Sequence, residues 1–182
     1  MMEGRSEEAE QACISQYADA ATMTDRIAAL ALMEAYLPEA AQKGLKDFYE
    51  RYRRDTLVMN KYFAVCAASE RAGCLERVAV LTEDPCFDMK VPNLVRSLIG
   101  TFSRNHLHFH DKNGAGYRFV AEKIVALDAI NPQIASGLAG AFKLYKRLHP
   151  DNREAMKREL EGILAVEGLS KNVYEIVEKI LE

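Results

Sequence analysis

Apolar residues recur at helical spacing along almost the whole chain. No segment alternates strictly between apolar and polar positions over the roughly four to eight residues of a half-buried strand. The last element shows the helical pattern most clearly, because its apolar residues fall on one face: Val173, Ile176, Val177, Ile180 and Leu181. Ser170 stands in the position of its N-cap. The pattern predicts an all-α protein.

The same spacing predicts helices through the rest of the sequence. Pro38 in a first turn is a strong start signal, and so is Asn131 followed by Pro132, because proline lacks an N–H that would be unpaired there anyway. The expected helices are 24–31, opened by Thr24 and Asp25, 38–52, 57–68, 74–81, 94–102, 117–127, from Asn131 to before Pro150, 156–164 and 173–181.

Roughly ten short helices with short connections predict antiparallel pairs stacked side by side, as in HEAT- or armadillo-like α-solenoids. No strict internal period is visible, so the superhelix is expected to be irregular. A compact helical bundle is the alternative. We expect one helical domain over residues 1–182, in which residues 1–10 are poorly packed linker or added sequence.

Composition and charge exclude several classes of protein. The chain has 49% hydrophobic and 28% charged residues, which is typical of a globular protein. No run approaches the roughly 20 apolar residues of a membrane span, and no secretory signal is visible, so we expect a cytoplasmic protein without a membrane partner. The net charge is -3 and basic residues are spread among acids, so nucleic acid is not an expected partner.

The cysteines give no sign of a metal or redox site. They show no C-x-x-C spacing, and buried free thiols are the default expectation. The four positions are Cys13, Cys66, Cys74 and Cys86.

Three histidines at alternate positions form the cluster that could suggest a metal: His106, His108 and His110. The surrounding residues predict a loop or a single helical turn, in which alternate side chains diverge, and Phe109 needs burial. The sequence has no H-E-x-x-H motif and no G-x-S-x-G motif. We therefore expect no catalytic residue and no metal ligand in this chain. The three histidines are expected to lie at the surface or to anchor a loop.

Two glycines lie inside the helix that begins at Asn131. Gly137 and Gly140 each cost about 1 kcal/mol relative to alanine in a helix interior. With Gln133 they fall on one face without bulk. One interpretation is close helix–helix packing through small residues. The other is the wall of a groove in which the helix N-terminus and the Gln133 amide face a ligand.

Six short motifs carry a resemblance that spans about residues 17–182. They are M-T-D-R at 23–26, N-K-Y-F at 60–63, R-S-L-I-G-T-F at 96–102, G-A-G-Y at 114–117, N-P-Q-I-A-S at 131–136 and L-S-K-N-V-Y-E-I at 169–176. Each is short, but their order and spacing together are specific. The chain resembles the C-terminal helical domain of bacterial aminopeptidase N, of the alanyl aminopeptidase type.

Members of that family are zinc-dependent metallopeptidases that remove N-terminal amino acids from peptides. The resemblance implies that the zinc ligands and catalytic acids lie in an upstream catalytic domain. This chain is then a C-terminal domain without a cofactor or catalytic centre of its own, and is inactive when isolated. Its implied role is to cover the active site and to shape the substrate cavity and entry channel, with the catalytic domain and the peptide substrate as partners.

The resemblance also implies which residues line the substrate cavity: Asn131, Gln133 and Gly137. Gln133 matches a glutamine of the family, whereas Gly137 stands where the family has an arginine. The charged contact expected for a peptide carboxylate or carbonyl is therefore missing at this position. A neighbouring domain, or the N-terminus of the Asn131 helix, is the candidate replacement.

A function of a different class is the alternative. An independent α-solenoid module would bind a protein partner through its concave face and would need no catalytic domain.

Overall fold

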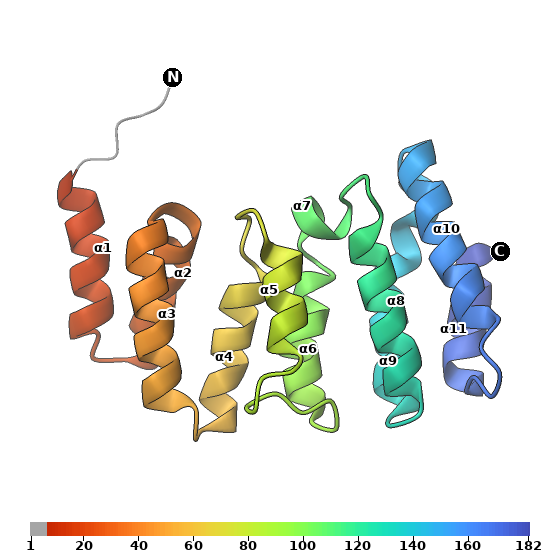
Figure 1. Cartoon of the computed structure of the whole chain (residues 1–182), viewed down its shortest axis with the longest axis horizontal. Helices are drawn as coiled ribbons and strands as arrows, with labels where there is room; N and C mark the ends of the chain where they lie inside the picture. The colour runs from red at the N-terminus through yellow and green to blue at the C-terminus, as the bar shows by residue number, and fades with distance from the viewer. Residues whose placement is uncertain (1–6) are drawn as a thin grey trace.

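The computed structural model describes residues 7–182, and in this range it contains helices and no strand (Figure 1). The helices are α1 (Glu7–Asp19), α2 (Met23–Tyr36), α3 (Pro38–Tyr52), α4 (Thr56–Ala67), α5 (Cys74–Leu81), α6 (Pro92–Phe102), α7 (His106–Phe109), α8 (Ala115–Asp128), α9 (Pro132–Ala139), the 3-10 helix η1 (Gly140–Arg147), α10 (Pro150–Leu164) and α11 (Lys171–Leu181).

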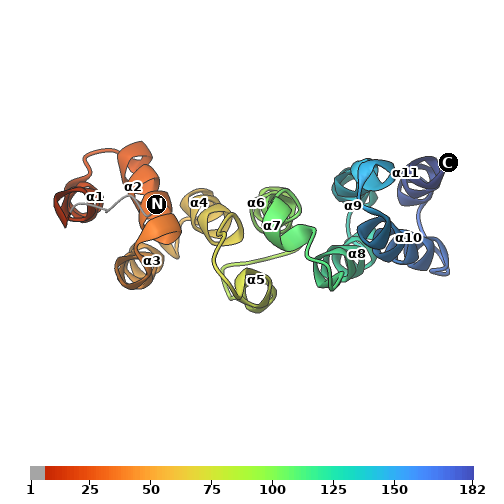
Figure 2. The same ribbon diagram turned by 90° about the horizontal axis from the view of Figure 1, so that it is seen from above.

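The helices form an elongated two-layered stack. Figure 2 shows α2, α4, α6, α9 and α11 in one row and α3, α5, α8 and α10 in the other, with α1 at the N-terminal end. The first described helix, α1, and the last, α11, lie at opposite ends of the stack (Figure 1). The predicted all-α solenoid is therefore confirmed, and the compact bundle is not formed.

The buried apolar residues divide into two clusters along this stack. The N-terminal cluster packs α1 to α4 together around Leu30 and Phe48. The C-terminal cluster is larger, extends from α4 to α11 and includes Phe63 and Tyr117. Full burial of one such side chain stabilises the fold by about 1.5–3 kcal/mol, so each cluster supports its own helices.

A buried carboxylate connects α2 to the turn between α4 and α5. Glu34 is only 2% exposed. Its oxygens accept a hydrogen bond from Oγ of Ser69 at 2.7 Å and lie 2.7 Å from Nη1 of Arg77 and 3.3 Å from Nη1 of Arg71. An unpaired buried charge is strongly unfavourable, so this network makes the burial of Glu34 possible and fixes α2 against its neighbours.

Two predicted helix starts are confirmed by their cap geometry. The Oδ1 atom of Asn131 accepts a hydrogen bond from the backbone N–H of Ile134 at 3.1 Å. The Oγ atom of Ser170 accepts one from the N–H of Val173 at 3.3 Å. Each cap satisfies a backbone donor that has no partner within its own helix.

The N-terminal boundaries differ from expectation. The cap of α2 is Thr22, which has extended backbone angles and accepts a hydrogen bond from the N–H of Asp25, so Thr24 already lies inside the helix. The helix α1 was not predicted. Residues 7–10 of the expected poorly packed segment form its first turns and are largely exposed, and residues 1–6 of that segment lie outside the described residues.

The helix predicted from Asn131 to before Pro150 is interrupted. An α-helix covers only Pro132–Ala139, and the next eight residues form η1. In a 3-10 helix, side chains three residues apart lie one above the other. This geometry puts both Phe142 and Tyr145 into the core, and Gly140 at the junction lowers the preference for a continuous α-helix.

None of the helices within residues 7–182 is both long enough and apolar enough to cross a bilayer.

Candidate functional site

A groove between α6 and α9 contains two of the three residues predicted for the substrate cavity. It has a volume of about 560 Å³. Its walls come from α6 and the turn after it, and from α9 and the start of η1. The lining residues are Val95, Arg96, Gly100, Ser103, Arg104, Gln133, Ile134, Gly137, Leu138, Gly140, Ala141 and Lys143. Both α6 and α9 belong to the same row of the stack (Figure 2).

Three cations line this groove, and no carboxylate does. They are Arg96, Arg104 and Lys143, all of them exposed to solvent. No ion pair of residues 7–182 includes any of the three. The groove is therefore locally positive in a chain whose net charge is -3, and it suits an anionic ligand.

The glycine face of α9 is open. A methyl group at Gly137 would meet nothing within 4 Å, and one at Gly140 would meet only the flexible Lys143 side chain, with Cε at 3.6 Å. The interpretation that these glycines permit close helix–helix packing is therefore wrong. Gln133 and Gly137 are both exposed on the groove wall, as the other interpretation expects, and their contact with a ligand stays a prediction.

Asn131 has a different place. It does not line this groove, and its side chain caps α9. The groove also contains cations that were not predicted as site residues: Arg96, Arg104 and Lys143. The sequence does contain a signal for Arg96 and Arg104. They are separated from Gly100 by four residues on either side, so all three share one side of α6 and its extension.

The histidine cluster forms the single turn α7, one of the two conformations that its sequence predicts. The rings of His106 and His110 stack with centroids 5.6 Å apart, and Phe109 is fully buried. The Nε2 atom of His108 is buried without a hydrogen-bond partner. Within the described part of the chain, no three His, Cys, Asp or Glu side chains group in a way that could hold a metal ion. The residues present therefore do not fit a zinc ion.

A hydrogen-bonded trio fixes α7 to its neighbours. The Tyr117 hydroxyl lies 2.8 Å from Nδ1 of His110 and accepts a hydrogen bond from Nδ2 of Asn152 at 3.0 Å. The Asn152 amide also donates to the carbonyl oxygen of His110 at 2.8 Å. Burial, and then the nearby His106, lower the pKa of His110, and burial raises the pKa of the Tyr117 hydroxyl. Both shifts favour the neutral forms of His110 and Tyr117, whose hydrogen bonds hold α7 against α8 and α10.

The cysteines are free thiols, as expected, but only two of them are fully buried. Cys66 and Cys74 lie in the core, whereas Cys13 and Cys86 are half-buried. Burial raises the pKa of Cys66 to about 12. This thiol is thus protonated at neutral pH and unsuited to nucleophilic attack.

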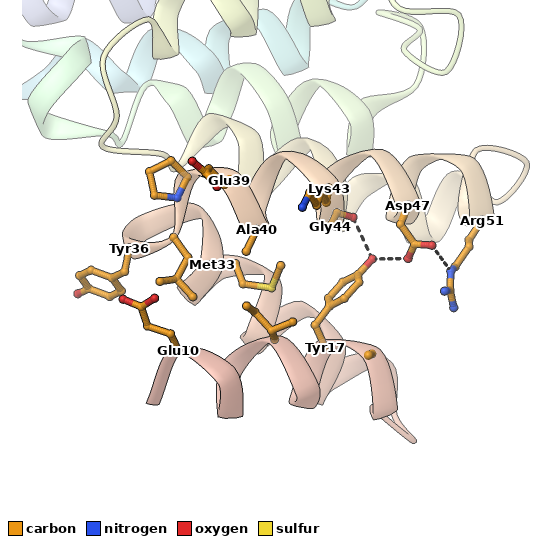
Figure 3. A pocket seen from close by; sticks show the side chains of 14 residues that line it. Glu10, Tyr17, Met33, Tyr36, Glu39, Ala40, Lys43, Gly44, Asp47 and Arg51 are labelled. Carbon is orange, nitrogen blue, oxygen red and sulfur yellow. Dashed lines mark hydrogen bonds and ion pairs between the residues drawn. The ribbon is translucent and has the colours of Figure 1, made fainter. Parts of the chain in front are cut away.

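A second groove lies at the N-terminal end, between α1, α2 and α3, and has a volume of about 750 Å³ (Figure 3). Three of its polar side chains, Tyr17, Asp47 and Arg51, form one connected network. The Tyr17 hydroxyl lies 2.9 Å from the carbonyl oxygen of Gly44 and 2.8 Å from Oδ2 of Asp47, and Oδ1 of Asp47 pairs with Nε of Arg51 at 2.8 Å. Burial, and next the hydrogen bond to Asp47, raise the pKa of Tyr17. These contacts hold α1 on α3 and offer no reactive group.

Comparison with known proteins gives consistent matches. Residues 1–182 match the family described as "Domain of unknown function (DUF3458_C) ARM repeats". The chain is 38% identical over 169 residues to aminopeptidase N of Caulobacter vibrioides, a match that covers 92% of this chain and 20% of that protein. It is 37% identical over 168 residues to aminopeptidase N of Escherichia coli, covering 91% of this chain and 19% of that protein.

A solved structure has the same fold. The crystal structure of Legionella pneumophila aminopeptidase A in complex with aspartic acid superposes with a TM-score of 0.90 at 30% identity, over 96% of this chain and 21% of that one. The chain therefore spans about one fifth of the length of these relatives. The resemblance indicated by the six motifs is confirmed.

Proposed function

We infer, because this chain belongs to the DUF3458_C family of ARM repeats, that it is the C-terminal domain of a zinc-dependent aminopeptidase that removes N-terminal amino acids from peptides. The observation that carries this proposal is the similarity of nearly the whole chain to one fifth of several aminopeptidases. The other four fifths of those proteins have no counterpart here, and we assign the catalytic centre and its zinc ion to a domain of that kind.

The proposed role of the helical stack is to cover the active site of the cytoplasmic parent enzyme. A rigid cover excludes bulk water and large polypeptides from the reaction, and it positions the part of the peptide beyond the scissile bond. The groove between α6 and α9 is the proposed wall of the substrate cavity, with Gln133 and Gly137 facing the peptide. The upstream catalytic domain and the peptide substrate are the proposed partners.

Replacing the matching segment of a relative tests this role. In a hybrid, this chain would substitute for the matching fifth of the Caulobacter aminopeptidase N. We expect the hybrid to hydrolyse an alanyl-anilide, and a truncated relative without the segment to lose most of its kcat/KM. The isolated chain supplied with zinc should give no turnover.

The outcomes separate the two functions. Turnover of the anilide by the isolated chain would contradict the proposal. A soluble, folded hybrid without activity would also count against it and would favour an independent module that binds a protein partner.

A further inference from the structure

We propose that the groove between α3 and α5 binds a short zwitterionic peptide, with the peptide's carboxylate beside Arg71 and Arg77 and its ammonium group beside Asp84. The groove has a volume of about 680 Å³. Both helices belong to the row of the stack opposite to that of α6 and α9 (Figure 2). This site is therefore separate from the α6–α9 groove, and it goes beyond the proposed function without depending on it.

One end of the groove carries a surplus positive charge. Arg71 and Arg77 share a single buried carboxylate, that of Glu34, at 3.3 and 2.7 Å, so one of the two charges is not neutralised. Their N–H donors also outnumber the acceptors around them, since the buried Nε of Arg77 has no hydrogen-bond partner within residues 7–182. Both side chains line the groove and are 37% and 29% exposed. This end can therefore receive a carboxylate, which guanidinium groups bind through two parallel hydrogen bonds.

The opposite end carries a carboxylate that no cation neutralises. Oδ1 of Asp84 accepts hydrogen bonds from the Tyr49 hydroxyl at 3.0 Å and from the backbone N–H of Cys86 at 2.8 Å. Both donors are neutral, and no ion pair of residues 7–182 includes Asp84. The other two charged residues of the lining, Lys46 and Glu50, pair with each other at 3.9 Å. Asp84 is thus the acceptor that this end offers to an ammonium group.

The order of contacts along α3 sets the distance between the two charged ends. Glu34, the partner of both arginines, lies just before Pro38 at the start of α3, whereas Tyr49, the partner of Asp84, lies near the end of that helix. The α3 residues of the lining cover about 18 Å at a rise of about 1.5 Å per residue. The long arginine side chains shorten this gap. An extended peptide of three or four residues spans about 10–14 Å and can reach both ends, whereas a free amino acid is too short.

An apolar surface lies between the charged ends. Leu45 and Tyr62 line this part of the groove, and the rings of Tyr49 and Tyr62 lie edge to face with their centroids 5.4 Å apart. Gln42 adds a side-chain amide that can both donate to and accept from a peptide backbone. The expected ligand is therefore a tripeptide or tetrapeptide with free ends and an apolar inner residue.

Peptide titration of the ¹⁵N-labelled chain tests the site. The probes are Ala-Leu-Ala with both ends free, its N-acetylated form, its C-terminal amide, the doubly blocked form, and free leucine. We expect saturable shifts of the Leu45, Tyr49 and Arg77 amide signals with the free tripeptide, weaker at high salt. Blocking either end should raise the dissociation constant about two- to fivefold, the effect of losing one exposed ion pair. Free leucine should bind more weakly than the free tripeptide.

Two variants and two controls assign the ends of the peptide. Arg71→Gln should weaken binding of the free tripeptide about two- to fivefold and leave that of its C-terminal amide unchanged. Asp84→Asn should weaken the free tripeptide equally and leave the N-acetylated form unchanged. Arg54→Gln and Glu83→Gln remove exposed charges that do not line the groove, and they should leave binding unchanged. Unaltered spectra of the free variants verify that each still folds.

The proposed site is disproved if the doubly blocked peptide binds as tightly as the free one, or if Arg71→Gln weakens the amide as much as the free tripeptide. Shifts confined to the Gln133 and Gly137 signals would place the peptide in the α6–α9 groove alone. That result would overturn the α3–α5 site and leave the proposed function standing. An inactive hybrid enzyme combined with the expected titrations would have the reverse meaning.

Discussion

Both carboxylate oxygens of Asp128 accept hydrogen bonds from Ser170, one from its backbone N–H at 2.7 Å and the other from its hydroxyl. Asp128 lies at the C-terminal end of α8 and is only 8% exposed, and Ser170 is the cap of α11. This contact joins residues 42 positions apart in the sequence. It therefore fixes the last helix of the stack to an earlier one.

Replacing Asp128 tests the strength of that link. Asp128→Ala leaves the part-buried N–H and hydroxyl of Ser170 without their acceptor, and we expect the free energy of unfolding to fall by about 2 kcal/mol. Urea unfolding followed by circular dichroism measures it. Glu122→Ala, on the exposed side of α8, should change stability by no more than about 0.5 kcal/mol. Equal stability of the two variants would show that the contact contributes nothing.

The buried pairing of Glu34 leads to a second prediction. Glu34→Ala removes the acceptor of Arg77 and Ser69, and we expect a loss of about 2–3 kcal/mol, because the half-buried Arg77 cation and the buried Ser69 hydroxyl lose their partner. The exposed Glu39 on α3 gives the matched control, Glu39→Ala. Thermal unfolding should separate the two variants clearly. A melting temperature of Glu34→Ala equal to that of the control would disprove the structural role of this network.

Two glycine-to-alanine substitutions should change the free energy of unfolding in opposite directions. A Cβ atom at Gly116 would lie 2.7 Å from the carbonyl oxygens of His108 and Phe109, so Gly116→Ala forces the backbones of α7 and α8 apart. We expect a loss of about 2 kcal/mol or more, as for other overpacked core positions. Gly137→Ala enters open space in a helix and should stabilise by about 0.4–1 kcal/mol. Chemical denaturation of both variants checks this, and destabilisation by Gly137→Ala would contradict the open wall.

The environment of His110 makes the stability of the fold depend on pH. Burial, and secondarily His106, lower the pKa of His110 in the folded chain, so the unfolded chain binds more protons just below the ordinary histidine pKa of about 6.5. This contribution to stability is complete above that pH and is lost as the pH falls through the window down to the lowered pKa. Unfolding free energies between about pH 5 and 8 should show a steeper acid loss for the wild-type chain than for His110→Gln. Parallel curves would rule out His110 as the cause.

Much of the fold is predictable because it depends on local rules. The start signals at Pro38, Asn131 and Ser170 act through caps and first turns within a few residues, and the structure has all three. The change to a 3-10 helix at Gly140 was missed because Phe142 and Tyr145, which both lie in the core, share one face at a spacing of three residues in either kind of helix. Helical periodicity alone does not distinguish these two cases.

The candidate groove was only partly predictable for a related reason. Gln133 and Gly137 belong to a motif and share a helix face, so they could be recognised in the sequence. Arg104 and Lys143 lie on different elements, and only the packing of α6 against α9 brings them to one groove. The charge of a site built from two elements depends on their relative placement, which a single sequence does not specify.

The separation of the core into two clusters determines how the stack comes apart. Leu45 and Tyr62 border both clusters, so α3 and α4 form the junction between the N-terminal helices and the rest of the stack. In a linear array each helix contacts mainly the helices beside it. One end can therefore unfold locally while the other remains folded. We therefore expect amide protons of α1 to exchange with deuterium faster than those of α8. Opening of the N-terminal helices can thus precede global unfolding of the C-terminal cluster.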